Sequence, residues 1–210
     1  MKHKFKKQLI KLFLQYLSKN LSLEKYKNLE NRIKNRTSES KELENENFMV
    51  AAVSILIEKD NPECPIYMIK RANEGRHALE WAFPGGKTEK NDIDLSATAT
   101  RETNEEIGAK INDFTLWGKL DPVTTLGTGW IIQPYVGEIN KNSFIKKNTD
   151  EVEEIAKIPL FKLIDKKNNR YVSFTSDGKR IDSKAYAYED KLIWGASARM
   201  IDQLSSILRD

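Results

Sequence analysis

Hydrophobic and polar positions divide the chain into three stretches with different patterns. Over residues 4–34, apolar side chains recur at three- and four-residue steps, which predicts one or two amphipathic helices. Residues 37–47 are polar and nearly devoid of apolar side chains, which predicts a linker. Residues 48–57 (FMVAAVSILI) form a continuous apolar run rich in β-branched residues, so we expect a strand buried on both faces.

The rest of the chain alternates strand and turn signals. Further strands are expected at 66–70, 114–120 and 131–139, and Pro134 in the last of these favours an edge strand or a bulge. Residues 171–188 predict a hairpin that turns at 176–179, and the C-terminal stretch 192–208 follows it. Its expected core residues are Leu192, Ile193, Ala198, Ile201, Leu204 and Leu208. The predicted organisation is a helical extension (1–36), a linker (37–47) and one globular domain (48–210).

Charge is concentrated at the N-terminus. Residues 1–20 hold six lysines and no acid, so they carry +6, whereas the whole chain of 210 residues carries +4. We expect this basic, amphipathic segment to pack on the domain or on a second subunit, as in a homodimer. Contact with an anionic membrane surface is an alternative, and RNA is a weaker one because no aromatic-rich nucleic-acid motif accompanies the lysines.

Composition limits the class of protein. A single cysteine, Cys64, excludes an internal disulfide framework and fits a reducing cytoplasm. No apolar run approaches the roughly 18 residues that span a bilayer. Lysines interrupt the N-terminal apolar stretch and no small-residue cleavage site follows it, so a signal peptide is not expected. We therefore expect a cytoplasmic protein.

The main candidate for chemistry is a helix that follows a Pro-Gly-Gly corner. Glu102, Glu105 and Glu106 are spaced i, i+3 and i+4, which places three carboxylates on one helical face. They precede Gly108, close to the negative end of the helix dipole, so the arrangement opposes stability. The helix is expected to begin near 94–96 and to end at Gly108 in the left-handed conformation. A hard divalent cation would relieve the repulsion, whereas the alternative is a solvated acidic face.

Residues 83–109 resemble the Nudix box. Its pattern is a glycine, an acid about six residues later, and then Arg-Glu-hydrophobic-x-Glu-Glu-x-Gly-hydrophobic. Arg101, Glu102, Glu105, Glu106 and Gly108 fill the second half, while Gly86 and Asp92 fit the first half with one inserted residue. The resemblance implies an α/β (α+β) fold, a Nudix-like α/β/α sandwich with a mixed sheet. It also implies Mg²⁺ or Mn²⁺ held by Glu102, Glu105, Glu106 and Gly86, with Arg101, Gly108 and Asp92 in structural roles.

Segments outside the box are similar to the coenzyme A diphosphatase branch of the Nudix hydrolases. Before the box, the similar residues are Arg71-Ala72, Arg76 and Phe83-Pro84-Gly85-Gly86. After the box, they are residues 120–125 and 127–139. The sequence departs from the branch at Glu80, which stands where the branch has a glycine. Candidate substrate-binding residues are Arg71, Arg76, His77, Gly85 and Thr125.

The resemblance implies an enzyme that hydrolyses a nucleoside diphosphate linked to another moiety, with coenzyme A or its derivatives as the first choice. The catalytic candidates are Glu102, Glu105, Glu106 and Glu151, and the general base is one of the last three. Alternatives are an ADP-ribose or nucleoside triphosphate pyrophosphatase, an enzyme that removes RNA caps, and a nucleotide-binding regulatory module without turnover.

Overall fold

The computed structural model describes residues 20–21, 24–38, 48–73, 77–125, 129–176 and 178–209. The expected amphipathic pattern over 4–19 and most of the expected linker lie outside them. The strands and helices, in chain order, are β1 (Met49–Glu58), β2 (Pro65–Arg71), β3 (Trp81–Ala82), β4 (Gly85–Lys87), α2 (Leu95–Ile107), η2 (Ile111–Asp113), β5 (Phe114–Lys119), β6 (Val123–Thr124), β7 (Trp130–Ile139), β8 (Val152–Pro159), α3 (Leu160–Leu163), η3 (Lys166–Asn168), β9 (Asn169–Ser176), β10 (Lys179–Tyr188), β11 (Lys191–Ile193) and α4 (Gly195–Arg209).

A mixed sheet forms the centre of the molecule. Its strand order is β3-β2-β1-β7-β5, with β4 paired to β1, β6 to β7 and β8 to β2. β1 and β7 run parallel over ten residue pairs, from Met49 opposite Trp130 to Glu58 opposite Ile139, and the other pairs are antiparallel. β1 is buried from Ala51 to its end, as the apolar run predicts, because both faces of the sheet are covered.

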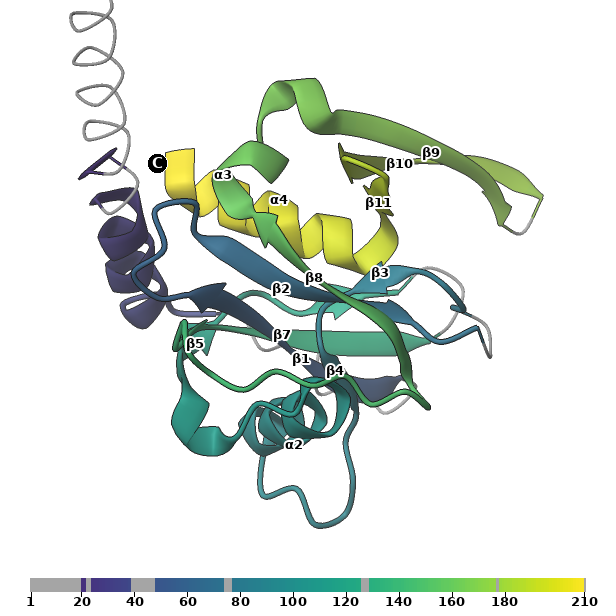
Figure 1. The fold of residues 1–210 in the computed structure, drawn as a ribbon. Coiled ribbons are helices and arrows are strands. Elements are labelled where there is room, and N and C mark those ends of the chain that lie inside the picture. The colour runs from purple at the N-terminus through teal and green to yellow at the C-terminus, as the bar shows by residue number, and fades with distance from the viewer. Residues whose placement is uncertain are drawn as a thin grey trace, which may run out of the picture.

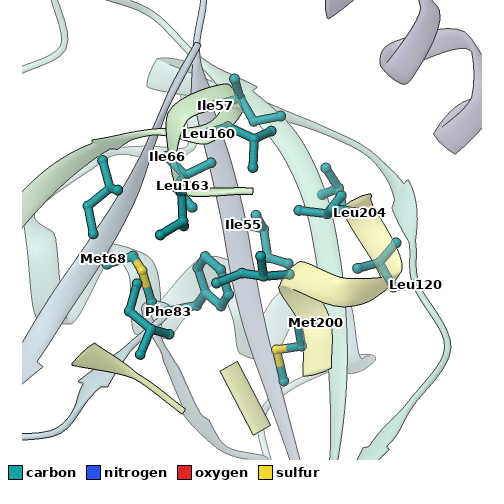
Figure 2. Packing of buried hydrophobic residues seen from close by; sticks show 14 of the residues in the cluster. Ile55, Ile57, Ile66, Met68, Phe83, Leu120, Leu160, Leu163, Met200 and Leu204 are labelled. Carbon is teal, nitrogen blue, oxygen red and sulfur yellow. The ribbon is translucent and has the colours of Figure 1, made fainter. Parts of the chain in front are cut away.

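Helices cover the two faces of this sheet, which confirms the expected α+β sandwich. Figure 1 shows α2 on one face and α3 and α4 on the other. Alternate β1 side chains enter two separate cores, since successive side chains of a strand point to opposite faces. Leu56 packs with Ile107 of α2, while Ile55 and Ile57 pack with α3 and α4. Figure 2 shows the second core, in which Leu160 and Leu163 of α3 and Leu204 of α4 meet Ile55, Ile57 and Ile66.

Three C-terminal strands form a second sheet, in the order β11-β10-β9. The predicted hairpin is confirmed, with Ser176 opposite Lys179 and Gly178 at φ 72°. The prediction that Leu192 belongs to the core is wrong, because its side chain is 45% exposed. Alternation along β11 directs Ile193 into the core and leaves Leu192 on the other side of the strand.

Of the two alternatives predicted for Pro134, an edge strand or a bulge, the edge strand is wrong. β7 lies inside the sheet, between β1 and the pair β5 and β6. Pro134 faces the break between these two short strands, because β5 ends opposite Tyr135 and β6 starts opposite Ile132. A residue without a backbone N–H is tolerated where the antiparallel ladder is already interrupted.

Residues 24–34 are helical and pack on the domain. Leu29 and Ile33 are 1% exposed, and the Tyr26 ring meets Trp117 edge-to-face with centroids 5.3 Å apart. The approach is close: a Cβ on Gly118 of β5 would lie 2.8 Å from the Ile33 carbonyl oxygen. This part of the expected extension therefore contributes to the core of the domain. Within the described residues, no helix combines the length and the apolar character needed to cross a membrane.

Candidate active site

The Gly-Gly corner brings backbone directly against the acidic helix. Gly85 has φ 154°, and a Cβ there would lie 2.3 Å from the Ala52 carbonyl oxygen of β1. At Gly86, a Cβ would lie 2.5 Å from Oε1 of Glu102. Gly85 requires glycine both for space and for its backbone conformation, whereas a side chain at Gly86 would displace the Glu102 carboxylate. The corner can therefore approach the Glu102 carboxylate only because no side chain intervenes.

Local sequence fixes both ends of α2. Asp94 is the N-cap, and its Oδ1 accepts a hydrogen bond from the Ala97 backbone N–H at 2.8 Å. Gly108 ends the helix at φ 71°, and its N–H donates to the Asn104 carbonyl. Ala99, Thr103 and Ile107 are fully buried against the sheet. These constraints set the rotation of the helix and thus the direction of its carboxylates.

Glu106 is the most buried acid of the group. Its side chain accepts a hydrogen bond from the Gly85 N–H at 2.8 Å, and the residue is 4% exposed. Burial raises the pKa of the Glu106 carboxyl to about 8, opposed by the Gly85 hydrogen bond and by the charge of Arg71. The negative charges of Glu102 and Glu151 raise this pKa further. A buried carboxyl near two other acids resists ionisation, because its surroundings would not compensate the negative charge.

Glu102 shares this environment. Its side chain is 15% exposed, and burial raises its pKa, opposed by the hydrogen bond and charge of Arg101. The charges of Glu105 and Glu151 act in the same direction as burial. Glu105 is more accessible, with its side chain 47% exposed, and accepts a hydrogen bond from Arg101 at 2.9 Å. The three glutamates thus differ in burial although they share one helical face.

Arg101 connects the helix to the preceding loop. Its Nε and Nη2 donate to the two carboxylate oxygens of Asp92, each at 3.1 Å, and its Nη2 also donates to the Lys87 carbonyl. These hydrogen bonds, together with those from the Glu89 N–H and the Thr98 hydroxyl, hold the pKa of Asp92 far below its usual range. Asp92 therefore lies beside Arg101 despite the inserted residue. Sequence reasoning missed Thr98, which stands six residues after Asp92 and donates to it at 2.8 Å.

Arg71 and Glu151 lie at the rim of the carboxylate group. The Ala72 N–H donates to the Glu151 carbonyl at 2.9 Å, which joins the end of β2 to the turn before β8. The charges of both residues act on Glu106. The Glu151 side chain is exposed and accepts a hydrogen bond from Asn148 at 3.3 Å. The structure thus gathers five of the predicted residues, Arg71, Glu102, Glu105, Glu106 and Glu151, around the Gly85–Gly86 corner.

The remaining predicted substrate-binding residues have other surroundings. His77 pairs with Glu80, with Nδ1 and Oε2 3.3 Å apart. Thr125 bonds to Trp130 across the end of β7, and its hydroxyl accepts from the Trp130 N–H at 3.0 Å. Arg76 lies outside the described residues.

The carboxylate oxygens of the site suit a hard divalent cation. Among the residues that the structure describes, no three His, Cys, Asp or Glu side chains converge as ligands. Glu102 and Glu105 turn toward Arg101, and Glu106 turns toward the Gly85 N–H. Their oxygens are nevertheless the ligand type that Mg²⁺ and Mn²⁺ prefer. The raised pKa values of Glu102 and Glu106 mark a place where a cation would be favourable, so these residues fit such an ion.

The fold and the site together define the class: an α+β sandwich with a glycine corner and an acidic helix on one face of a mixed sheet. The NUDIX domain family model matches residues 48–177, which is more than half of the chain. The chain therefore belongs to the Nudix family, and it is a hydrolase that acts on pyrophosphate bonds of nucleoside diphosphate derivatives.

Similar proteins agree with this assignment. The uncharacterized Nudix hydrolase NudL of Yersinia pestis (strain Pestoides F) is 33% identical over 147 residues, which cover 69% of this chain and 72% of the relative. The protein of the same name from Photorhabdus laumondii subsp. laumondii is 32% identical over 129 residues, which cover 61% of this chain and 68% of the relative. The crystal structure of a MutT/nudix family protein from Enterococcus faecalis superimposes with a TM-score of 0.54 at 16% identity, covering 86% of this chain and 73% of that one. At that identity the superposition shows the fold.

Proposed function

We propose that this hydrolase cuts the diphosphate bond of coenzyme A or its derivatives with the help of Mg²⁺ or Mn²⁺. The observation that carries the reaction is the contact of the Gly85–Gly86 corner with the half-buried Glu102 and the buried Glu106. The choice of substrate is supported by the sequence pattern of Arg71-Ala72 before Phe83-Pro84-Gly85-Gly86 and by residues 120–139 after the box.

Glu102, Glu105 and Glu106 are proposed to hold the metal together with Gly86. Such an ion, when bound, offsets phosphate charge and lowers the pKa of a bound water. The chain itself supplies position: Arg101 and Asp92 hold the loop against the helix, and Gly85 fixes Glu106 through its N–H. Arg71, at the rim, is proposed to meet a phosphate oxygen of the substrate, because a guanidinium binds phosphate bidentately.

Three carboxylates are candidates for accepting the proton of the attacking water. Glu105 and Glu151 are exposed and so remain accessible to water, while Glu106 is buried with a pKa of about 8, near the working range of a general base. The pH–rate profiles of the three Glu→Gln variants separate them. The variant that removes the base loses the acidic limb of the profile, where the rate rises with pH as the base ionises, whereas a variant that only weakens metal binding keeps this limb.

A product assay tests the proposal. Purified protein is incubated with Mg²⁺ or Mn²⁺ and coenzyme A, ADP-ribose, nucleoside triphosphates or capped RNA, and products are identified by mass spectrometry. We expect 4′-phosphopantetheine and 3′,5′-ADP from coenzyme A. Turnover of another of these substrates alone would reject coenzyme A and retain the hydrolase.

Glu105→Gln is the matched catalytic variant. We expect it to lower turnover by at least about 10²-fold without unfolding the protein, because the side chain is 47% exposed and supports no core contact. Glu63→Gln is the control, since Glu63 lies in the turn between β1 and β2 and pairs with Lys162. Full metal-dependent activity of Glu105→Gln would contradict the assignment of this residue.

A further inference from the structure

β9 (Asn169–Ser176) forms an open edge of the second sheet. Within the described residues, the strand order β11-β10-β9 leaves the outer side of β9 without a partner strand. Its pairing with β10 keeps one register over eight residue pairs, from Asn169 opposite Tyr186 to Ser176 opposite Lys179. Figure 1 shows the tip of this hairpin extending away from α4 and the large sheet. A long, regular edge of this kind presents unpaired backbone N–H and C=O groups.

The other strand edges of the described structure carry features that prevent edge-to-edge pairing. β3, β4, β6 and β11 have only two or three residues. β8 exposes the charged side chains of Glu153, Glu154 and Lys157, and β5 is interrupted by a register shift between Leu116 and Gly118. Short strands, charges and irregular pairing are the usual protection of sheet edges. β9 has none of them over residues 171–176, which contain no charged residue and no proline.

Three residues of β9 direct their backbone groups outward. Backbone groups of a strand point alternately to its two sides, and a two-residue turn closes on a hydrogen-bonded pair. The turn between Ser176 and Lys179 therefore makes the even-numbered residues of β9 bond to β10 and the odd-numbered residues point away from it. The outward residues are Tyr171, Ser173 and Thr175, whose side chains are exposed, that of Tyr171 to 75%.

Asn169 limits the free edge at the start of the strand. Its N–H donates to the Lys166 carbonyl, and its carbonyl accepts a hydrogen bond from the Arg170 guanidinium. A partner strand therefore gains no backbone hydrogen bond at Asn169, although this residue is odd-numbered. The free donors and acceptors run from Tyr171 to Thr175 and are symmetric about the residue between them, Ser173.

We propose that β9 pairs antiparallel with β9 of a second copy of this chain, about a two-fold axis at Ser173. In this register Ser173 faces its own equivalent and Tyr171 faces Thr175, so all three outward residues of each copy are paired. Val172 falls opposite Phe174, and such β-branched–aromatic pairs stabilise antiparallel sheets. The two three-stranded sheets then form one continuous sheet.

The symmetry of the free groups selects a second copy as the partner. An isologous contact places the same row of donors and acceptors on both sides, and it closes at the dimer. No like charges meet, because residues 171–176 are uncharged and the two copies of Arg170 lie at opposite ends of the paired strands. The proposal concerns assembly, and Ser173 lies outside the carboxylate group, so the test does not depend on the reaction.

Sedimentation velocity of the full chain tests for the dimer. The protein is measured between about 1 and 200 μM, the range in which small interfaces associate. We expect a monomer–dimer equilibrium with a Kd of about 10 μM, because one strand pair is a small interface. A monomer at every concentration overturns the proposal.

Two substitutions of Ser173 test the role of its backbone N–H. Ser173→Pro removes this donor at the axis, and a proline is tolerated in an edge strand where the N–H faces outward. We expect the Kd to rise at least about tenfold, since each copy loses a hydrogen bond. Ser173→Ala is the matched control, because it loses the hydroxyl contacts with Asp182 and Arg180 but keeps the N–H, and it should dimerise like the wild type. Far-UV circular dichroism and thermal unfolding check that both variants retain the fold.

A charge pair at the axis tests the register. Ser173→Lys and Ser173→Glu each place like charges opposite one another, so each variant alone should be monomeric, whereas an equimolar mixture should regain the dimer. The control is the same pair of changes at Thr175, which faces Tyr171 and not its own equivalent. Mixing Thr175→Lys with Thr175→Glu should therefore give no recovery.

The remaining outcomes also decide the proposal. Recovery in the mixture at Ser173, and none in the mixture at Thr175, supports the two-fold axis at Ser173. Recovery only at Thr175 overturns this register. A dimer that survives Ser173→Pro in a folded protein overturns the proposal and assigns the contact to another surface, such as the basic segment 1–20.

Discussion

Substitution of Glu106 tests whether ionisation of its buried carboxyl destabilises the folded protein when no cation is bound. The perturbation is Glu106→Gln, measured with a chelator present so that no divalent ion contributes. The amide oxygen of glutamine can still accept the hydrogen bond from the Gly85 N–H, which Glu106 accepts at 2.8 Å. The substitution therefore removes the titrating charge and keeps the shape and the hydrogen bond.

The raised pKa of Glu106 determines how the stability of the wild type changes with pH. The carboxyl has a pKa of about 8 in the folded protein, against 4.5 as its ordinary value, so the folded state binds more protons than the unfolded state between these values. The contribution of Glu106 to stability is therefore fully present below pH 4.5 and is lost as pH rises through about 8. At about 1.4 kcal/mol per pKa unit, the loss between pH 5 and pH 9 amounts to about 4 kcal/mol. The variant lacks this loss.

Urea denaturation at pH 5, 7 and 9 measures the difference. We expect the free energy of unfolding of Glu106→Gln, relative to the wild type, to rise by about 4 kcal/mol from pH 5 to pH 9. The control is Glu105→Gln, which removes a half-exposed carboxylate from the same helical face. A Glu106→Gln difference that does not depend on pH would refute the reasoning, because the carboxyl would then ionise in the folded protein as easily as in the unfolded chain.

Two further predictions concern the supports of the site and the N-terminal helix. Arg101→Lys cannot keep the two-pronged contact with Asp92, so we expect about a 10–100-fold lower kcat/KM and a higher metal requirement in steady-state assays; an unchanged metal titration would contradict this. Leu29→Ala should cost about 2–5 kcal/mol in urea denaturation with kcat unchanged, because Leu29 is 1% exposed; unaltered stability would mean that residues 24–34 do not pack on the domain.

Local signals predicted the helix and the central strand well. The α2 boundaries follow from Asp94 as N-cap and Gly108 as the left-handed C-terminal residue, and both are observed. The continuous apolar run of β1 marks burial on two faces, and the structure confirms it. These features depend on neighbours within a few residues, so the sequence alone contains the required information.

Features that depend on distant partners were not predictable in the same way. Pro134 occupies an interior strand because two short strands on its far side leave a break, and no local pattern shows where that break falls. The close approach of Ile33 to Gly118 joins residues 85 positions apart. The turn of Leu192 away from the core depends on the register of β11 against β10.

The candidate site shows the same division. Spacing on one helix places Glu102, Glu105 and Glu106 together on one face, yet it says nothing of which acid is buried. That difference arises from the sheet: Gly85 of β4 covers Glu106 and donates to it, while Glu105 remains at the surface. The electrostatic reach of Arg71 and Glu151 likewise depends on the pairing of β2 with β8.

Burial and cation affinity in this site are two consequences of one arrangement. The Arg101 guanidinium donates hydrogen bonds to the carboxylates of Asp92, Glu102 and Glu105 and so offsets their negative charge. Glu106 accepts one hydrogen bond, from the Gly85 N–H, and is otherwise stabilised only by the charge of Arg71. The uncompensated charge is therefore concentrated on the most buried acid. A cation that binds there relieves the electrostatic cost of the ionised Glu106 carboxylate. Because it binds the folded chain and not the unfolded one, its binding free energy also stabilises the fold. A fully neutralised site would give a more stable protein with less affinity for the ion.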